Sequence, residues 1–211
     1  QIMGSATTWS SAEGKVSVND QAALFIKTDG TIWGTGAGGA GRLCQPTNVY
    51  FSSPVQVSAS TNWSIVANGY GTVAATKTDG TLWNWGENEN GMLGQNSPEN
   101  SDRSSPVQIG SATNWTSVSL SYLHVMAVNT SGELWTWGKN STWGNLGVNN
   151  RTEYSSPVQV PGTNWSTIVS GTNWSVASKT DGTAWAWGSY NSIGQMGNNT
   201  RGTGYSSPVQ V

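Results

Sequence analysis

Charged side chains are scarce in this 211-residue chain: they make up 9% of it, with a net charge of −2 and a pI near 5.2. Proteins that bind nucleic acid or acidic membranes present clustered lysines and arginines. The nine lysines and arginines found here form no basic run. We therefore expect no nucleic acid and no acidic membrane surface among the partners of this protein.

Reactive side chains are equally few. The chain has one histidine, His124, and one cysteine, Cys44, so no intrachain disulfide can form and the Cys/His spacings of metal sites are absent. No carboxylate stands at a fixed short spacing from His124, which leaves no evident route to an activated nucleophile. The sequence predicts a protein that is not an enzyme and has no metal or cofactor.

Long apolar runs and helical periodicity are missing as well. No stretch is long enough to cross a bilayer, so we expect no membrane insertion. Gln1 opens the chain without a charged-then-apolar leader, and we expect the native N-terminus to lie upstream. Two phenylalanines stand against 13 tryptophans and 27 glycines, a balance that favours flat rings between sheets over a leucine-rich helical core.

What the sequence does contain is a repeat. The stretch TDGTLWNWG at residues 78–86 returns in related form at 28–36, 130–138 and 180–188, and its glycines are 50, 52 and 50 residues apart. A fixed period of this size indicates a repeat architecture. Asp-Gly predicts a tight turn, and the alternation after it predicts a strand.

Two further signals complete each unit: an Asn-Trp or similar pair before the turn, and SSPVQ after a Gly/Asn-rich loop. In the second copy we expect strands at about 63–68, 72–77, 81–86 and 104–109. The SSPVQ prolines belong at strand starts or sheet edges, because proline has no N–H to donate. The predicted fold is all-β, a β-propeller of four-stranded antiparallel blades. We expect one repeat domain over 1–211, with units of about 1–57, 58–109, 110–160 and 161–211.

The run from Gly69 to Gly94 resembles the repeat of the regulator of chromosome condensation (RCC1) family, and the likeness returns in all units. It is weakest in the first, where Thr35 replaces the second tryptophan, Cys44 replaces a glycine and Ser10 to Val16 form an insertion, so we expect that blade to be the least regular. The family implies a seven-bladed propeller. Its founding member is a chromatin-bound exchange factor for a small GTPase, and its bacterial relatives include an inhibitor of β-lactamases.

Seven blades of this period need about 350 residues by the family's count. Gln1-Ile2 and Gln210-Val211 also occupy the same phase of the repeat. Four blades can close a ring alone, since propellers have about 4 to 8 blades. We favour instead an open arc that belongs to a longer chain or that associates with itself.

The turn aspartates Asp29, Asp79 and Asp181 suggest a repeated calcium ligand at first sight. One carboxylate per turn supplies too few oxygens for that ion, so we interpret each as an Asx-type turn residue.

Candidate binding residues are the large rings that break the repeat. Most tryptophans recur at fixed places and are predicted to be core, whereas Trp143 and Trp174 have no counterpart in the other units. Variation gathers in two loops, and rings that lose little entropy on binding suit such positions. His124 shares a column with Ala22, Thr72 and Trp174 and has a second interpretation, as a histidine hydrogen-bonded within its blade. The predicted partner-binding residues are Tyr70, Tyr122, His124, Trp143, Trp174 and Tyr190.

Three functions remain open at this stage. The favoured one is a non-enzymatic scaffold that binds a protein partner through variable loops. The abundance of Trp, Asn and Ser/Thr favours, as an alternative, a carbohydrate-binding or surface propeller of a cell or virion; the third is nucleotide exchange on a small GTPase. The close similarity of the repeats indicates recent duplication and a microbial or viral source, with an extracellular or virion-surface location weakly favoured.

Overall fold

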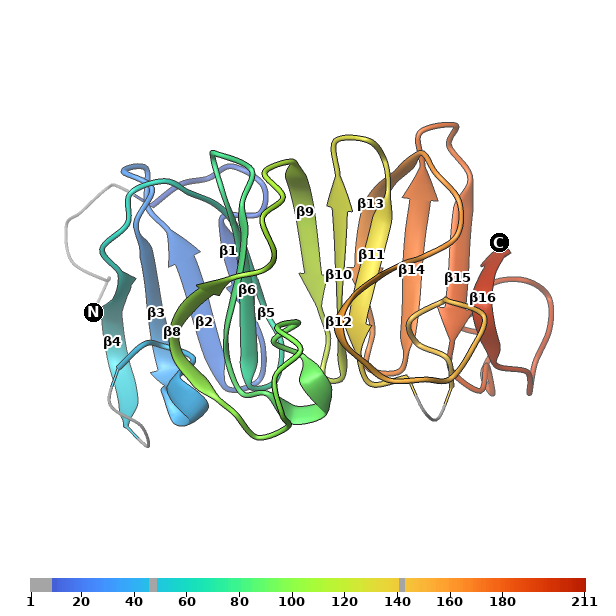
Figure 1. Cartoon of the computed structure of the whole chain (residues 1–211), viewed down its shortest axis with the longest axis horizontal. Helices are drawn as coiled ribbons and strands as arrows, with labels where there is room; N and C mark the ends of the chain where they lie inside the picture. Colours follow the sequence, from blue (N-terminus) through green and yellow to red (C-terminus); the bar gives the residue numbers. More distant parts are fainter. Residues whose placement is uncertain (1–8, 46–48, 141–142) are drawn as a thin grey trace. The chain divides into compact units, whose positions relative to one another are not determined.

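A computed structural model describes residues 9–45, 49–140 and 143–211. Over these residues the fold consists of four sheets (Figure 1). Each sheet has four antiparallel strands, which are consecutive in the sequence and pair with their sequence neighbours. Short 3-10 turns, η1 (Gly39–Gly41) and η2 (Glu89–Gly91), interrupt two of the loops. The predicted all-β fold with four-stranded antiparallel blades is confirmed.

The first two sheets have the strand orders β1-β2-β3-β4 and β5-β6-β7-β8. Their strands are β1 (Val16–Val18), β2 (Ala22–Ile26), β3 (Ile32–Ala37), β4 (Tyr50–Ser58), β5 (Trp63–Asn68), β6 (Thr72–Lys77), β7 (Leu82–Gly86) and β8 (Arg103–Gln108).

The other two sheets have the orders β12-β11-β10-β9 and β13-β14-β15-β16. Their strands are β9 (Trp115–Leu120), β10 (His124–Asn129), β11 (Leu134–Gly138), β12 (Tyr154–Gln159), β13 (Trp165–Ser170), β14 (Trp174–Lys179), β15 (Ala184–Gly188) and β16 (Tyr205–Gln210).

The chain divides into two compact units. The first runs to Asn88 and takes in Asn100–Asn114, so it holds the first two sheets, and the second contains Glu89–Glu99 and Trp115–Val211. The prediction of a single repeat domain stays a prediction. The comparison of Gln1-Ile2 with the last two residues falls on positions outside the described residues.

The strand boundaries follow from local chemistry. The four strands expected in the second repeat lie within a residue of their predicted positions. Gly80, in the turn between β6 and β7, has φ +78, and an added Cβ would lie 2.0 Å from the carbonyl oxygen of Thr113. Only glycine fits this close approach at positive φ. The SSPVQ prolines all lie in strands at a sheet edge, namely β4, β8, β12 and β16.

The Trp-x-Trp-Gly sequence that ends the repeated stretch, residues 83–86 in the second repeat, is called the WxWG motif. The core of each unit contains the second tryptophan of this motif. Trp85, Trp137 and Trp187 are 0% exposed. Each indole N–H donates to a carbonyl in the long loop of the preceding repeat, namely that of Arg42, Met92 and Asn145 respectively, at a distance of 2.8 Å. Repeats are therefore joined by a hydrogen bond buried between them as well as by apolar packing.

The first repeat departs from the others where the sequence indicated. Trp9 forms only an isolated bridge with Lys27, and β1 begins seven residues later and is three residues long. Cys44 adopts φ 52, the conformation that Gly94 has in the second repeat, and burial raises the pKa of its thiol to about 12. This cysteine is a half-buried turn residue and its thiol stays protonated at neutral pH.

Candidate binding surface

The second unit has two chemically different ends. At one end lie the turns 121–123 and 171–173 and the long loops 139–153 and 189–204, which we call the loop end. At the opposite end lie the tight turns 130–133 and 180–183, which we call the turn end. Side-chain contacts between the starts of β10 and β14 place the loop ends of the two sheets together.

Rings and one aliphatic side chain gather at the loop end. The Trp143 and Tyr190 rings lie 5.5 Å apart between centroids, at 44°, although they come from different long loops. Tyr190 is 52% exposed, and Ile193 in the same loop is 80% exposed. Tyr122, in the turn between β9 and β10, is 44% exposed. Trp174 is half-buried and its indole lies against Gly171.

We call the set Tyr122, Trp143, Trp174, Tyr190 and Ile193 the aromatic loop surface. Sequence reasoning missed Ile193. Its place in the sequence could have identified it: Ile193 directly precedes the loop glycine Gly194, just as Trp143 directly precedes the corresponding Gly144.

Buried asparagines hold the long loops in place. Asn140 is 0% exposed; its amide donates to the carbonyls of Asn150 and Thr152, and its oxygen accepts from the amide of Leu146. Asn191 repeats the arrangement with Thr200 and Met196. These bonds connect residues on the two sides of each loop, next to the aromatic loop surface.

His124 does not belong to that surface. It is 0% exposed, and its Nδ1 and Nε2 lie 2.9 Å from Ser121 Oγ and 2.7 Å from Ser175 Oγ. The Ser175 hydroxyl donates to the carbonyl of Asn145, so it accepts from Nε2–H and leaves Nδ1 to accept from Ser121. Burial lowers the pKa of His124 to about 4. This is the hydrogen-bonded structural histidine of the second interpretation, and it joins two neighbouring sheets.

Tyr70, the remaining predicted residue, lies in the first unit, half-buried in the turn between β5 and β6. The loop of this unit contains a buried arginine that the sequence did not reveal: Arg42 is 5% exposed and donates to Gln21 Oε1 at 2.7 Å. Burial lowers the pKa of Arg42, while the nearby Glu87 and Tyr70 raise it.

The turn aspartates are Asx-turn residues. The hydroxyl and amide of Thr31 both donate to Asp29 Oδ1, at 2.6 and 3.0 Å, which holds the pKa of that carboxyl below its usual value. The Thr31 hydroxyl in turn accepts from the indole N–H of Trp33 at 2.9 Å. The same chain of bonds recurs at Asp79-Thr81-Trp83 and at Asp181-Thr183-Trp185.

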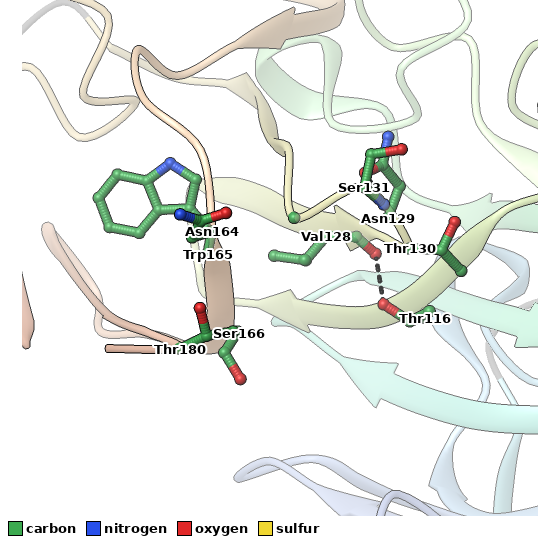
Figure 2. A pocket seen from close by; sticks show the side chains of 10 residues that line it. Thr116, Val128, Asn129, Thr130, Ser131, Asn164, Trp165, Ser166 and Thr180 are labelled. Carbon is green, nitrogen blue, oxygen red and sulfur yellow. Dashed lines mark hydrogen bonds between the residues drawn. The ribbon is translucent and has the colours of Figure 1, made fainter. Parts of the chain in front are cut away.

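A groove of about 450 Å³ lies at the turn end of the second unit (Figure 2). Its lining is uncharged and mixes polar side chains with the apolar Val128 and Trp165. Figure 2 shows Asn164 and Ser166 facing Thr130 and Ser131 across it, and Thr116 Oγ1 donating to the carbonyl of Val128 at 3.0 Å. The lining residues are Thr116, Val128, Asn129, Thr130, Ser131, Gly132, Asn164, Trp165, Ser166 and Thr180.

Two negative findings complete the survey of the described residues. No group of three or more His, Cys, Asp or Glu side chains within that part of the chain is arranged to hold a metal ion. Within the same part there is no helix with the length and apolar character needed to span a bilayer.

Comparison with known proteins places these features in a family. The model of the regulator of chromosome condensation (RCC1) repeat matches residues 79–128 and 131–178, and a second RCC1 repeat model matches residues 115–142. No curated protein sequence gives a significant match.

Solved structures show the same fold. Prp20p of Saccharomyces cerevisiae is 16% identical with a TM-score of 0.80, over 93% of this chain and 49% of that one. Human WBSCR16 is 22% identical with a TM-score of 0.80, over 95% and 54%. Yeast RCC1 (Prp20) bound to Kap60 is 16% identical with a TM-score of 0.82, over 93% and 48%.

The chain thus spans about half the length of these structures. The four-stranded sheets, the repeated WxWG strand and the matching repeat models agree with one another. Residues 79–178 contain RCC1 repeats, and the chain as a whole has an RCC1-like β-propeller fold.

Proposed function

We propose that this protein is a non-enzymatic recognition propeller that binds a protein partner through the aromatic loop surface. The observation that carries the proposal is the Trp143–Tyr190 ring pair, which two different long loops bring together at 5.5 Å. Core packing does not need these rings, because Trp137 and Trp187 fill the repeated core positions.

The chemistry of the surface suits a protein partner. Tryptophan and tyrosine dominate the energetics of protein interfaces, because they bury large areas and have few rotatable bonds. Asn140 and Asn191 order the loops before any partner arrives, which lowers the entropy cost of binding. Exposed Ile193 adds apolar area beside the rings.

The relatives support a protein as the ligand. The structure of Prp20p is described together with its binding to Gsp1p and histones, and yeast RCC1 is described bound to Kap60. These partners belong to those proteins. For this chain we carry over only the class of partner.

A capture experiment tests the proposal. The wild-type protein, the W143A/Y190A variant and a Y50A control would be immobilised and exposed to lysate of the source, and captured proteins would be quantified by mass spectrometry. Tyr50 is 83% exposed but lies outside the aromatic loop surface. We expect at least one protein to be held by wild type and Y50A and lost from W143A/Y190A. Equal capture by all three would contradict the proposal.

A carbohydrate ligand is the second candidate, and the groove at the turn end favours it. Its lining combines hydroxyls and amides with the ring of Trp165 and contains no charged side chain, which suits a neutral polyol. Glycan-array binding that S131A/S166A abolishes and S156A retains would establish this function. If no glycan binds the wild type, or if the groove variant binds as well as the wild type, this candidate is wrong.

A further inference from the structure

Three repeats carry an ammonium group over a pair of tryptophans. Lys27 Nζ lies 5.2 and 3.7 Å from the ring centroids of Trp9 and Trp33. Lys77 Nζ lies 4.7 and 4.2 Å from Trp63 and Trp83, and Lys179 Nζ lies 4.7 Å from both Trp165 and Trp185. At such distances a cation is attracted by the faces of both rings.

The third repeat has the ring pair and lacks the cation. Trp115 and Trp135 lie 6.4 Å apart at 82°, close to the 6.1 Å and 80° of Trp63 and Trp83. Asn129 takes the place of the lysine, as its pairing with Trp115 in the sheet shows, just as Lys77 pairs with Trp63. Over the residues that the structure describes, no lysine or arginine lies above this third pair.

The polar groups around the pair also differ. Glu133 replaces the threonine that accepts the indole N–H in the other repeats, and its Oε2 accepts from Asn129 Nδ2 at 2.7 Å. The indole nitrogen of Trp135 is buried without a hydrogen-bond partner, whereas those of Trp33, Trp83 and Trp185 donate to a threonine; the indole nitrogens of Trp63, Trp115 and Trp165 are all buried without a partner. Trp115 is 9% exposed, whereas Trp63 and Trp165, which lie under lysines, are each 2% exposed.

The third pair therefore combines two ring faces and a carboxylate, with the uncharged Asn129 where the other repeats have a lysine. The geometry of the rings is preformed, so a cation from outside would meet the same arrangement that the protein uses for its own lysines. The carboxyls of Asp29, Asp79 and Asp181 interact with Lys27, Lys77 and Lys179, whereas the side chain of Glu133 is bonded to the uncharged Asn129. Electrostatics at this position favours a positive ligand.

We propose that Trp115, Trp135 and Glu133 form a binding site for an alkylammonium group, such as the side chain of a lysine or methylated lysine presented by another molecule. The site lies at the turn end, away from the aromatic loop surface, and does not depend on the function proposed there. A methylated ammonium suits it best, since such a group binds ring faces well and loses less hydration on leaving water.

The test uses Nα-acetyl-trimethyllysine amide as the probe and Nα-acetyl-norleucine amide as its neutral counterpart. Indole N–H signals would be followed by 1H–15N NMR during titration of the whole chain. We expect saturable shifts of the Trp115 and Trp135 signals with the cationic probe and none with the neutral one. In E133Q we expect binding several-fold weaker.

Two reciprocal variants make the test specific. N129K supplies the lysine that the other repeats have, so it should occupy the site and weaken probe binding at least tenfold. K179N removes a lysine, so the Trp165 and Trp185 signals should become responsive. If N129K does not fold, K179N decides alone. Absence of saturable shifts, equal shifts with the neutral probe, unchanged binding in folded N129K or silent Trp165 and Trp185 signals in K179N would each overturn the proposal.

Discussion

Trp187 and Trp143 lie in the same unit and differ in almost every respect. Trp187 occupies a position that recurs in the repeats, is 0% exposed, and donates its indole N–H to the carbonyl of Asn145. Trp143 recurs nowhere, is half-buried, and contacts the ring of another loop residue, Tyr190. In a repeat protein, a residue that packs against the next repeat is needed in every repeat. A large ring at a position without that requirement is free to serve binding.

The largest expected effect comes from the repeated core ring. W187A removes a fully buried indole and its hydrogen bond, and should lower the free energy of unfolding by about 3–5 kcal/mol. Urea denaturation of the variant and the wild type measures this loss. A decrease smaller than about 1 kcal/mol would show that the repeated position is not the core of the unit.

His124 is an exception to the rule that repeated residues are buried and non-repeated ones are exposed: it does not repeat, and it is buried. Burial lowers its pKa to about 4, against an ordinary value of 6.5. Below pH 6.5 the unfolded chain takes up a proton that the folded chain does not, so stability should fall as the pH drops from 6.5 towards 4 and this loss should level off below that. The shift corresponds to at most about 3 kcal/mol.

Unfolding free energies of the wild type and H124Q between pH 7.5 and 4 test this expectation. The glutamine variant should lose the part of the pH dependence that belongs to the imidazole. Parallel curves for the two proteins would mean that His124 does not titrate as its burial requires.

The turn threonine is a repeated position of moderate effect. T183V removes the hydroxyl that accepts from Trp185 and donates to Asp181, and should cost about 1 kcal/mol of stability. In the third repeat E133T makes the opposite change and gives Trp135 an acceptor, so its free energy of unfolding should rise. Thermal unfolding of the two variants compares them, and a rise for T183V would contradict this account of the turn.

The smallest effect on stability should come from W143A. Because the ring is only partly buried and packs on the loop residue Tyr190, its removal should change the free energy of unfolding by about 0.5 kcal/mol or less. Early melting of W143A, with a loss like that of W187A, would assign Trp143 to the packing and remove it from the aromatic loop surface.

Much of the fold could be predicted because its signals are local and occur four times. The Asp-Gly turn, the alternating WxWG strand and the edge-strand proline are each determined by backbone chemistry, and the structure places them within a residue or so of the prediction. The insertion of the first repeat was visible as a change in spacing. Partners across repeats were not visible: neither the carbonyl acceptors of the buried indoles nor the Ser121-His124-Ser175 bonds follow from sequence spacing.

The candidate site was predicted only in outline. Non-repetition identified Trp143 and Trp174, and the variability of the long loop added Tyr190. Neither signal shows whether His124 is exposed or buried, because its burial depends on which neighbouring sheet covers the start of β10. The sequence shows asparagine at position 129, where three repeats have lysine. Only the distances between Lys Nζ and the paired rings in those repeats show that this lysine lies over two tryptophans.

The indole hydrogen bonds between repeats have a direction, since the donor always lies in the repeat made later. The carbonyls of Arg42, Met92 and Asn145 accept from the indoles of Trp85, Trp137 and Trp187, which are synthesised later. During synthesis each long loop therefore remains incompletely bonded while the ribosome adds more than 40 residues, which takes about 2–9 s at about 5–20 residues per second. Until then, the carbonyl of Arg42, Met92 or Asn145 lacks the indole that it accepts from in the folded protein.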